Sequence, residues 1–296
     1  FRVGEEDIEL IADRTRALPV NDPFDRELTV SCGAALFNLR VAAAAVQLDA
    51  LVELLPARED PDVLARVTLA MNSGRRFHDA DALAGALPRR RTYRRQFLPQ
   101  VVDRSQIEAL CAAATLEGVH MEPFITGAGR SALGELIAEG DGIQWEDPHW
   151  RRELAAWLHP RRQGDGLNMP GFAVPTAQLI MRSFDMGDGV AARHLDVVRG
   201  SPLLVVLATP ADEPYDWLLA GQALERMLLR ACADGLQASF LNQPVQVPAL
   251  RPRLQALAPH AGIPQLVLRL GYPGTDLPPT PRRPLEDVLQ ADWPIP

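Results

Sequence analysis

Arginine is the residue type whose spacing points most directly to chemistry in this chain. Five arginines fall within residues 89–95, and Arg282 and Arg283 stand together among prolines near the other end. The chain contains no lysine and carries a formal net charge of −8. Because one planar guanidinium can bind two phosphate oxygens at once, clustered arginines in an acidic chain indicate a small anionic ligand.

Each arginine cluster also has a plainer interpretation. The first fits a solvated basic turn after Pro88, and the second fits a solvated tail. Thr92 adds a hydroxyl donor and Phe97 could anchor the following chain, while prolines limit the backbone freedom around the second cluster. This mixture favours a phosphate clamp, provided that both clusters belong to one folded unit.

The sequence shows no pattern typical of a metal site, a catalytic lysine or a catalytic triad. The histidines are scattered without metal-ligand spacing, so we assign no metal. Without lysine, neither a lysine Schiff base nor a Walker A loop can form. We assign no catalytic side chain, because no triad or dyad is recognisable. Trp145, Trp150 and Trp157 are interpreted as core residues rather than as partners for a stacked cofactor.

Bulk composition limits the remaining classes. The 296 residues, 47% hydrophobic and 23% charged, are typical of a globular protein of one large or two ordinary domains. The acidic balance argues against a nucleic-acid partner, and no apolar run reaches the ~18–20 residues that would predict a membrane span. Three scattered cysteines fit a cytoplasmic location. The chain opens without Met inside an apparent strand, so we expect further residues upstream.

The elements that must position the arginines follow from apolar periodicity. Strands are predicted at 1–12 (as a strand or hairpin), 63–69, 120–126, 203–208 and 264–270. Helices are predicted at 28–55, 105–117, 131–139 and 216–234, the last ended by Gly235. Residues 70–88 are expected to be a polar connection and 127–129 a turn. The Gly- and Pro-rich residues 163–189 are expected to form a long irregular segment that could act as a lid.

The two long helices contain a possible internal repeat. Residues 33–36 (Gly-Ala-Ala-Leu) resemble residues 221–224 (Gly-Gln-Ala-Leu), and a predicted strand follows each helix. The simplest interpretation is a duplicated unit whose halves pack as a pseudo-dimer. The alternative is two unrelated Ala/Leu-rich helices that align by chance.

Several separated motifs resemble the nitroreductase superfamily. Residues 90–97 (Arg-Arg-Thr-Tyr-Arg-Arg-Gln-Phe) look like its Arg-Arg-Ser-x-Arg-x-Phe opening, residues 221–236 like its central helix, and residues 281–288 like its C-terminal arginine arm. The branch that resembles Acg is indicated by residues 13–19, 22–23, 26–28, 31–39 and 238–244. The resemblance covers nearly the whole chain.

This resemblance implies an α+β nitroreductase-like fold of two related halves, 1–87 and 88–296, each with a central helix and an antiparallel-type sheet. It implies FMN between the halves. The phosphate and ribityl end would be lined by Arg90, Arg91, Thr92, Arg94, Arg282 and Arg283. Asn242 and Gln243 would lie near flavin N5, where the family has a Glu-Gly pair.

Two departures from the family pattern bear on stoichiometry. The Pro-Ser-x-x-Asn-x-Gln-Pro-Trp segment that contacts the flavin from the partner half should precede Phe1, and the first half lacks a comparable phosphate-binding cluster. We therefore predict one FMN per chain, in a monomeric pseudo-dimer or a homodimer.

Three functions follow as hypotheses. The first is an FMN-dependent NAD(P)H oxidoreductase that reduces a flat aromatic acceptor such as a nitroaromatic or a quinone. The second is a flavin-binding, flavin-sequestering protein whose lid covers the flavin. The third and weakest is a binding module for another phosphate ligand.

Overall fold

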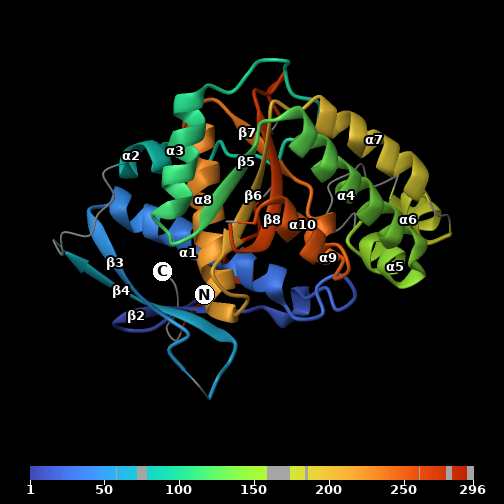
Figure 1. Cartoon of the computed structure of the whole chain (residues 1–296). Coiled ribbons are helices and arrows are strands. Elements are labelled where there is room, and N and C mark those ends of the chain that lie inside the picture. Colours follow the sequence, from blue (N-terminus) through green and yellow to red (C-terminus); the bar gives the residue numbers. More distant parts are fainter. Residues whose placement is uncertain are drawn as a thin grey trace.

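Two long helices cross at the centre of the molecule (Figure 1). The computed structural model describes residues 1–57, 59–71, 79–158, 174–183, 186–259, 261–277 and 282–291. Helix α1 (Arg26–Ala45) and helix α8 (Pro214–Ala233) pack closely against each other. α1 is the one described helix that is long and apolar enough to cross a bilayer. Its packing in the core accounts for this apolar character.

A five-stranded sheet lies against α1. Its order is β3-β4-β2-β1-β9, formed by β1 (Arg2–Val3), β2 (Asp7–Ile11), β3 (Leu48–Leu54), β4 (Val63–Met71) and β9 (Gln290–Ala291). Neighbouring strands are antiparallel except β9, which runs parallel to β1. β9 therefore forms one edge of the sheet and pairs with β1, the first strand of the chain.

A four-stranded antiparallel sheet lies against α8. Its order is β5-β6-β8-β7, formed by β5 (His120–Phe124), β6 (Leu203–Thr209), β7 (Gln237–Phe240) and β8 (Ile263–Gly271). β6 is buried along its whole length, as its continuous apolar run predicts.

The two sheets have the same internal order. The series β1-β2-α1-β3-β4 corresponds, element by element, to β5-β6-α8-β7-β8, and each series gives the same strand neighbours in the same antiparallel directions. The additional strand in the first sheet is β9.

The remaining helices surround this frame. α2 (Ala80–Ala86) and α3 (Arg104–Thr115) pack on α8. α4 (Gly127–Glu146), α5 (Pro148–Ala156), α6 (Val174–Ser183) and α7 (Gly187–Arg199) gather on one side of the molecule, at the right in Figure 1. Two short helices, α9 (Gln243–Gln246) and α10 (Arg251–Leu257), and two 3₁₀ turns, at Arg14–Arg16 and Leu285–Asp287, complete the described elements.

The predicted α+β class is confirmed, and most predicted elements are present. The predicted helix over 28–55 is wrong after Ala45, because Gln47 adopts a left-handed conformation (φ 66°) and the chain turns back as β3. Residues 127–129 are the first turn of α4 rather than a separate turn.

Two predicted irregular segments also contain helices. Residues 80–86 of the expected polar connection form α2, while residues 72–78 lie outside the described residues. In the predicted lid over 163–189, residues 174–183 are α6 and α7 begins at Gly187; residues 163–173 and 184–185 lie outside the described residues. The prediction of a long irregular segment is therefore wrong for its described second half.

Candidate functional site

The first arginine cluster runs along the free edge of β7. The backbone N–H of Tyr93 donates to the carbonyl of Ala238 (2.8 Å), and Thr92 forms a parallel bridge with the same residue. Tyr93 and Phe97 are buried and stack with ring centroids 5.2 Å apart. These two aromatic side chains anchor the segment that carries the arginines.

Arg269 on β8 holds this segment through its backbone carbonyl groups. Its Nη2 donates to the carbonyl oxygens of Tyr93 (2.9 Å) and Arg95 (3.0 Å), and its guanidinium lies 4.6 Å from the centre of the Phe97 ring. Burial lowers the pKa of Arg269 to about 10. Arg269 therefore supports the cluster without belonging to its exposed face.

Arg90 and Arg91 point to different partners. Arg90 Nε lies 3.0 Å from Oε1 of Glu225, a buried carboxylate in the middle of α8. Arg91 donates from Nη1 to the carbonyl oxygens of Pro88 (2.6 Å) and Arg90 (2.8 Å). Its Nε is buried and has no hydrogen-bond partner within the described ranges. A buried donor of this kind is costly unless a ligand or water satisfies it.

The second arginine cluster reaches the same carboxylate. Arg282 lies close enough to Glu225 to stabilise its negative charge, as Arg90 does more strongly. Arg283 instead donates from Nη2 to the carbonyl of Asp287 (2.7 Å) in the following turn. Both clusters therefore place one arginine near Glu225, Arg90 in direct contact and Arg282 within electrostatic range.

Arg94 lies on the wall of a separate cavity of about 590 Å³. The cavity is also lined by Ser31 of α1, Trp150 and Trp157 near α5, and Gln246 of α9. Burial lowers the pKa of Arg94. No hydrogen bond joins its guanidinium to another described side chain, so its donors are available to a ligand in the cavity.

Helix α5 and the loop before α1 hold this cavity in shape. Glu153 accepts the backbone N–H groups of Val20 and Asn21, each at 2.9 Å. The indole N–H of Trp150 donates to Oδ1 of Asn21 at 2.8 Å. The guanidinium of Arg16 lies 5.4 Å from the centre of the Trp157 ring. Both tryptophans are therefore held by residues of the first half.

Asn242 and Gln243 diverge at the beginning of α9. Asn242 Nδ2 donates to Oε1 of Glu27 on α1 (3.2 Å), while its Oδ1 accepts the backbone N–H of Val267 (3.0 Å). Gln243 Nε2 donates to Asp141 of α4 (2.9 Å). Burial raises the pKa of Glu27, which also accepts hydrogen bonds from Gln246 at 3.0 Å. Asn242 thus links to the first half and Gln243 to the α4 side.

One stripe of α1 connects all three parts of the predicted site. Glu27 accepts a hydrogen bond from Asn242, and Ser31 lines the same cavity as Arg94. Asn38 lies close enough to Glu225 to favour its negative charge. These three residues are four and seven positions apart, a spacing that places them on one helix face over about 16 Å. α1 therefore presents three polar side chains along the face that these residues of the second half approach.

The residues present fit a ligand with an anionic end and a flat ring. The arginine-rich end holds an orphaned buried donor on Arg91, and the other end is a cavity lined by two indoles and by Arg94. Of the eight predicted site residues, the structure brings Arg94 and Asn242 to α1, and Arg90 and Arg282 to the vicinity of Glu225 on α8. The side chains of Gln243 and Arg283 have the partners described above, and Thr92 contributes an edge bridge to β7.

Several residues of this site were missed from the sequence. Trp150 and Trp157, interpreted as core, line the cavity, whereas Trp145 is buried as predicted. Glu27, Ser31 and Asn38 carried a usable signal, since they form a polar stripe in an otherwise apolar helix. Glu225 gave none beyond being an acidic residue in a buried helix.

Comparison with known proteins identifies the relatives of the chain. No protein-family model matches it. "Putative NAD(P)H nitroreductase Rv3131" of Mycobacterium tuberculosis is 31% identical over 305 residues, covering 99% of this chain and 85% of that protein. "Putative NAD(P)H nitroreductase acg" of the same organism is 28% identical over 295 residues, covering 96% and 87%.

Solved structures give a weaker likeness. The FMN-dependent nitroreductase NfnB from Mycobacterium smegmatis, in complex with NADPH, covers 71% of this chain and 98% of its own at 18% identity and a TM-score of 0.47. Family membership rests instead on the match to Rv3131 over 99% of this chain, with the motifs and the α+β architecture in agreement. The chain belongs to the nitroreductase superfamily, together with Rv3131 and Acg.

Proposed function

We propose that the chain binds one FMN between its two halves and acts as an NAD(P)H-dependent oxidoreductase of the nitroreductase type. The observation that carries the proposal is the polar stripe on α1. Its three residues meet the arginine clusters, the Arg94 cavity and Asn242 in a single line. The names of the relatives Rv3131 and Acg support the NAD(P)H-linked activity.

The two ends of the site would hold different parts of FMN. Arg90, Arg91 and Arg282 would bind the phosphate, with Thr92 and Arg283 contributing at its margin. Arg94 and the two cavity tryptophans would hold the flat ring system and limit its contact with water. The backbone at Asn242 and Gln243 would lie at the reactive edge of the ring, where nearby hydrogen bonds influence flavin electronics.

FMN, when bound, accepts a hydride from a reduced nicotinamide and passes electrons to a second substrate. The chain itself needs to bind, orient and shield the ring. A cavity of about 590 Å³ that opens beside Trp150 and Trp157 is suited to a flat aromatic acceptor, such as a nitroaromatic or a quinone.

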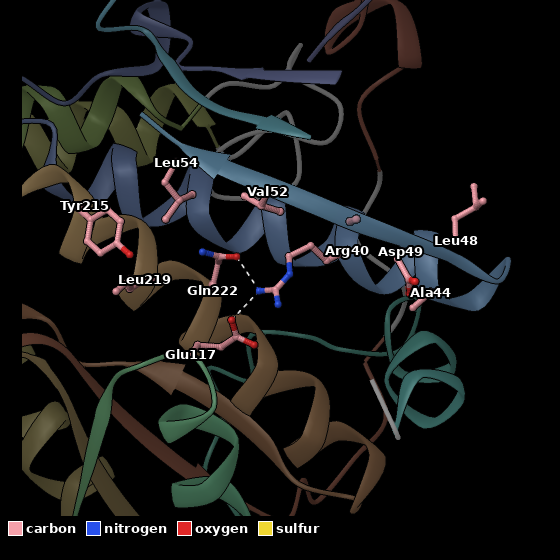
Figure 2. Close-up of a pocket in the computed structure, with 11 residues that line it drawn as sticks. Arg40, Ala44, Leu48, Asp49, Val52, Leu54, Glu117, Tyr215, Leu219 and Gln222 are labelled. Carbon is pink, nitrogen blue, oxygen red and sulfur yellow. Dashed lines mark hydrogen bonds and ion pairs between the residues drawn. The ribbon is translucent and has the colours of Figure 1, made fainter. Parts of the chain in front are cut away.

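A cavity of about 380 Å³ lies between β3 and α8 (Figure 2). Leu219, two residues before Gly221, lines it, just as Ser31, two residues before Gly33, lines the Arg94 cavity. At its base Arg40 donates to Glu117 (2.6 Å) and Gln222 (2.8 Å), as the dashed lines in Figure 2 mark. These paired groups, in place of an arginine clamp, support the proposal of one FMN per chain.

The matching order of the two sheets supports the proposal that 1–87 and 88–296 are related halves. One chain then supplies both sides of its flavin site, and we expect a monomer that is equivalent to a nitroreductase dimer, with a homodimer as the alternative. We also expect a cytoplasmic protein, since its three cysteines are all free thiols in the structure.

The test begins with the absorbance spectrum of the purified protein. We expect a flavin spectrum with close to one FMN per chain, and rapid bleaching when NADH or NADPH is added without oxygen. A colourless protein that takes up no FMN on reconstitution would refute the proposal as a whole. FMN that neither nicotinamide bleaches would refute the enzymatic part, leaving flavin sequestration.

A further inference from the structure

Glu225 is a buried carboxylate of α8 that three other segments of the chain approach. It stands in the middle of α8 and is 3% exposed. Arg90 approaches it from the segment before α3, Arg282 from the C-terminal arm, and Asn38 from α1. The neighbouring Arg226 does not contribute, because it is turned to Glu117 (3.0 Å) and Asp79 (3.3 Å).

The contact between Arg90 and Glu225 uses only part of the guanidinium. Nε of Arg90 lies 3.0 Å from Glu225 Oε1, and neither terminal nitrogen of Arg90 has a hydrogen-bond partner in the part of the chain that the structure describes. The Arg90 side chain is 26% exposed and that of Glu225 only 4%. The free edge of the guanidinium is therefore directed away from the buried carboxylate, toward the outer face of the site.

We propose that Glu225 is a positioning residue for the FMN phosphate: it holds Arg90 through Nε and draws Arg282 to the same place, so that their remaining N–H groups converge on one anion. The inference rests on the proposed function and assigns this residue within it. Without a carboxylate between them the two arginines would repel each other, and their long side chains would have to be ordered by the ligand itself.

The charges at this point still favour an anion. Arg90 and Arg282 outnumber Glu225, so the three groups together are net positive, and Arg91 adds its orphaned Nε nearby in the chain. The C-terminal turn also carries Glu286 and Asp287, and Nε of Arg283 lies 4.0 Å from the carboxylate of Asp287. Burial opposes the charge on Glu225, whereas Arg90, Asn38 and Arg282 favour it. The carboxylate therefore has the partners that a buried acceptor requires.

The test compares FMN with riboflavin, which differs only by the phosphate. Flavin-free protein is titrated with each compound, following the quenching of flavin fluorescence. For Glu225→Ala we expect FMN affinity to fall about tenfold or more, the value of a lost charge-assisted contact, with riboflavin affinity unchanged. Glu225→Gln keeps an acceptor for Arg90 Nε but loses the negative charge beside the two arginines, so its loss of FMN affinity should be smaller than that of Glu225→Ala.

A second variant avoids disturbing the core. Arg90→Lys keeps the positive charge on a partly exposed side chain, but an ammonium cannot bind Glu225 through one nitrogen and present two others. It should lose FMN preference to about the same extent as Glu225→Ala. The matched control is Glu117→Ala, which removes another buried carboxylate that joins two arginines, at the cavity of Figure 2. It should leave the ratio of FMN to riboflavin affinity unchanged.

Two results would overturn the inference. If Glu225→Ala bound FMN as tightly as wild type or more tightly, the carboxylate would be neutral or a competitor of the phosphate. Alternatively, FMN and riboflavin affinities could fall equally, which would indicate a merely structural role. Wild-type protein that binds neither flavin would instead refute the proposed function, so the two failures are distinguishable.

Discussion

Gly33 of α1 and Gly221 of α8 face each other where the two central helices cross. A Cβ added to Gly221 would lie 2.0 Å from the carbonyl oxygen of Val30 and 2.8 Å from Cα of Gly33. A Cβ added to Gly33 would lie 2.4 Å from the carbonyl oxygen of Leu218. The helices can approach this closely only because both positions lack a side chain, and these are the two glycines that the repeated sequence aligns.

Substitution at the crossing should therefore destabilise the whole protein. Because backbone atoms block the new methyl group, Gly33→Ala or Gly221→Ala should force the helices apart and lower the free energy of unfolding by about 1–3 kcal/mol or more. Gly142→Ala in α4 is the control, since an added Cβ would meet nothing within 4 Å. It should be neutral or stabilising by up to about 1 kcal/mol. Urea unfolding measures all three; equal effects would contradict the close approach.

The sequence predicted the features that depend on local residue patterns. It did not predict those that depend on contacts between distant parts of the chain. The glycine repeat predicted two related central helices, and buried Tyr93 and Phe97 explain why an aromatic pair accompanies the arginine motif. β3 was missed because its residues continue the apolar composition of α1, and only the turn at Gln47 separates them. Such a break arises when the chain pairs with β4, a contact that helical periodicity does not encode.

The site was predictable to the same degree. The motifs located the arginines. They did not indicate that Glu225, more than 130 residues from Arg90 in sequence, would contact it. Trp150 and Trp157 looked like core residues because their environment is set by the loop around Asn21. Long-range contacts of this kind depend on the packing of the two halves, which residue types alone do not specify.

Arg94 should contribute to the ring end of the site rather than to the phosphate end. Because its guanidinium lines the cavity with Trp150 and Trp157, Arg94→Ala should weaken FMN and riboflavin alike, by about tenfold. Fluorescence titration with both flavins measures this. Arg104→Ala is the control, since Arg104 is a 92% exposed side chain paired with Glu108. A selective loss of FMN in Arg94→Ala would place this arginine at the phosphate instead.

Asp212 should make stability depend on acidic pH. Burial alone would raise the pKa of Asp212, but hydrogen bonds from Arg251, Trp217 and Gln265 outweigh it and lower the pKa to about 2. A folded-state pKa below the ordinary value of 3.8 adds stability above about pH 4, and this contribution is lost as the pH falls through 2. Asp212→Asn should therefore be less stable than wild type at pH 7, with the difference shrinking between pH 4 and pH 2.

Urea unfolding of both proteins at several pH values measures that difference directly. Other carboxylates titrate over the same range, so the comparison between variants is informative and a single curve is not. A difference that stayed constant from pH 7 to pH 2 would contradict the assignment of a charged pair to Asp212 and Arg251, which lie 2.6 Å apart.

Cys32 should be an unreactive thiol in the folded protein. Burial in α1 raises the pKa of Cys32 from 9.0 to about 11. The thiolate is the reactive form, and raising the pKa from 9.0 to about 11 lowers the thiolate population at pH 8 about a hundredfold. In a Cys111→Ser, Cys232→Ser background, Cys32 is the only thiol of the chain. Ellman's reagent should modify Cys32 about a hundred times more slowly in the folded protein than in the same protein unfolded in urea. Equal rates in the two states would show that α1 leaves this thiol ionisable and accessible.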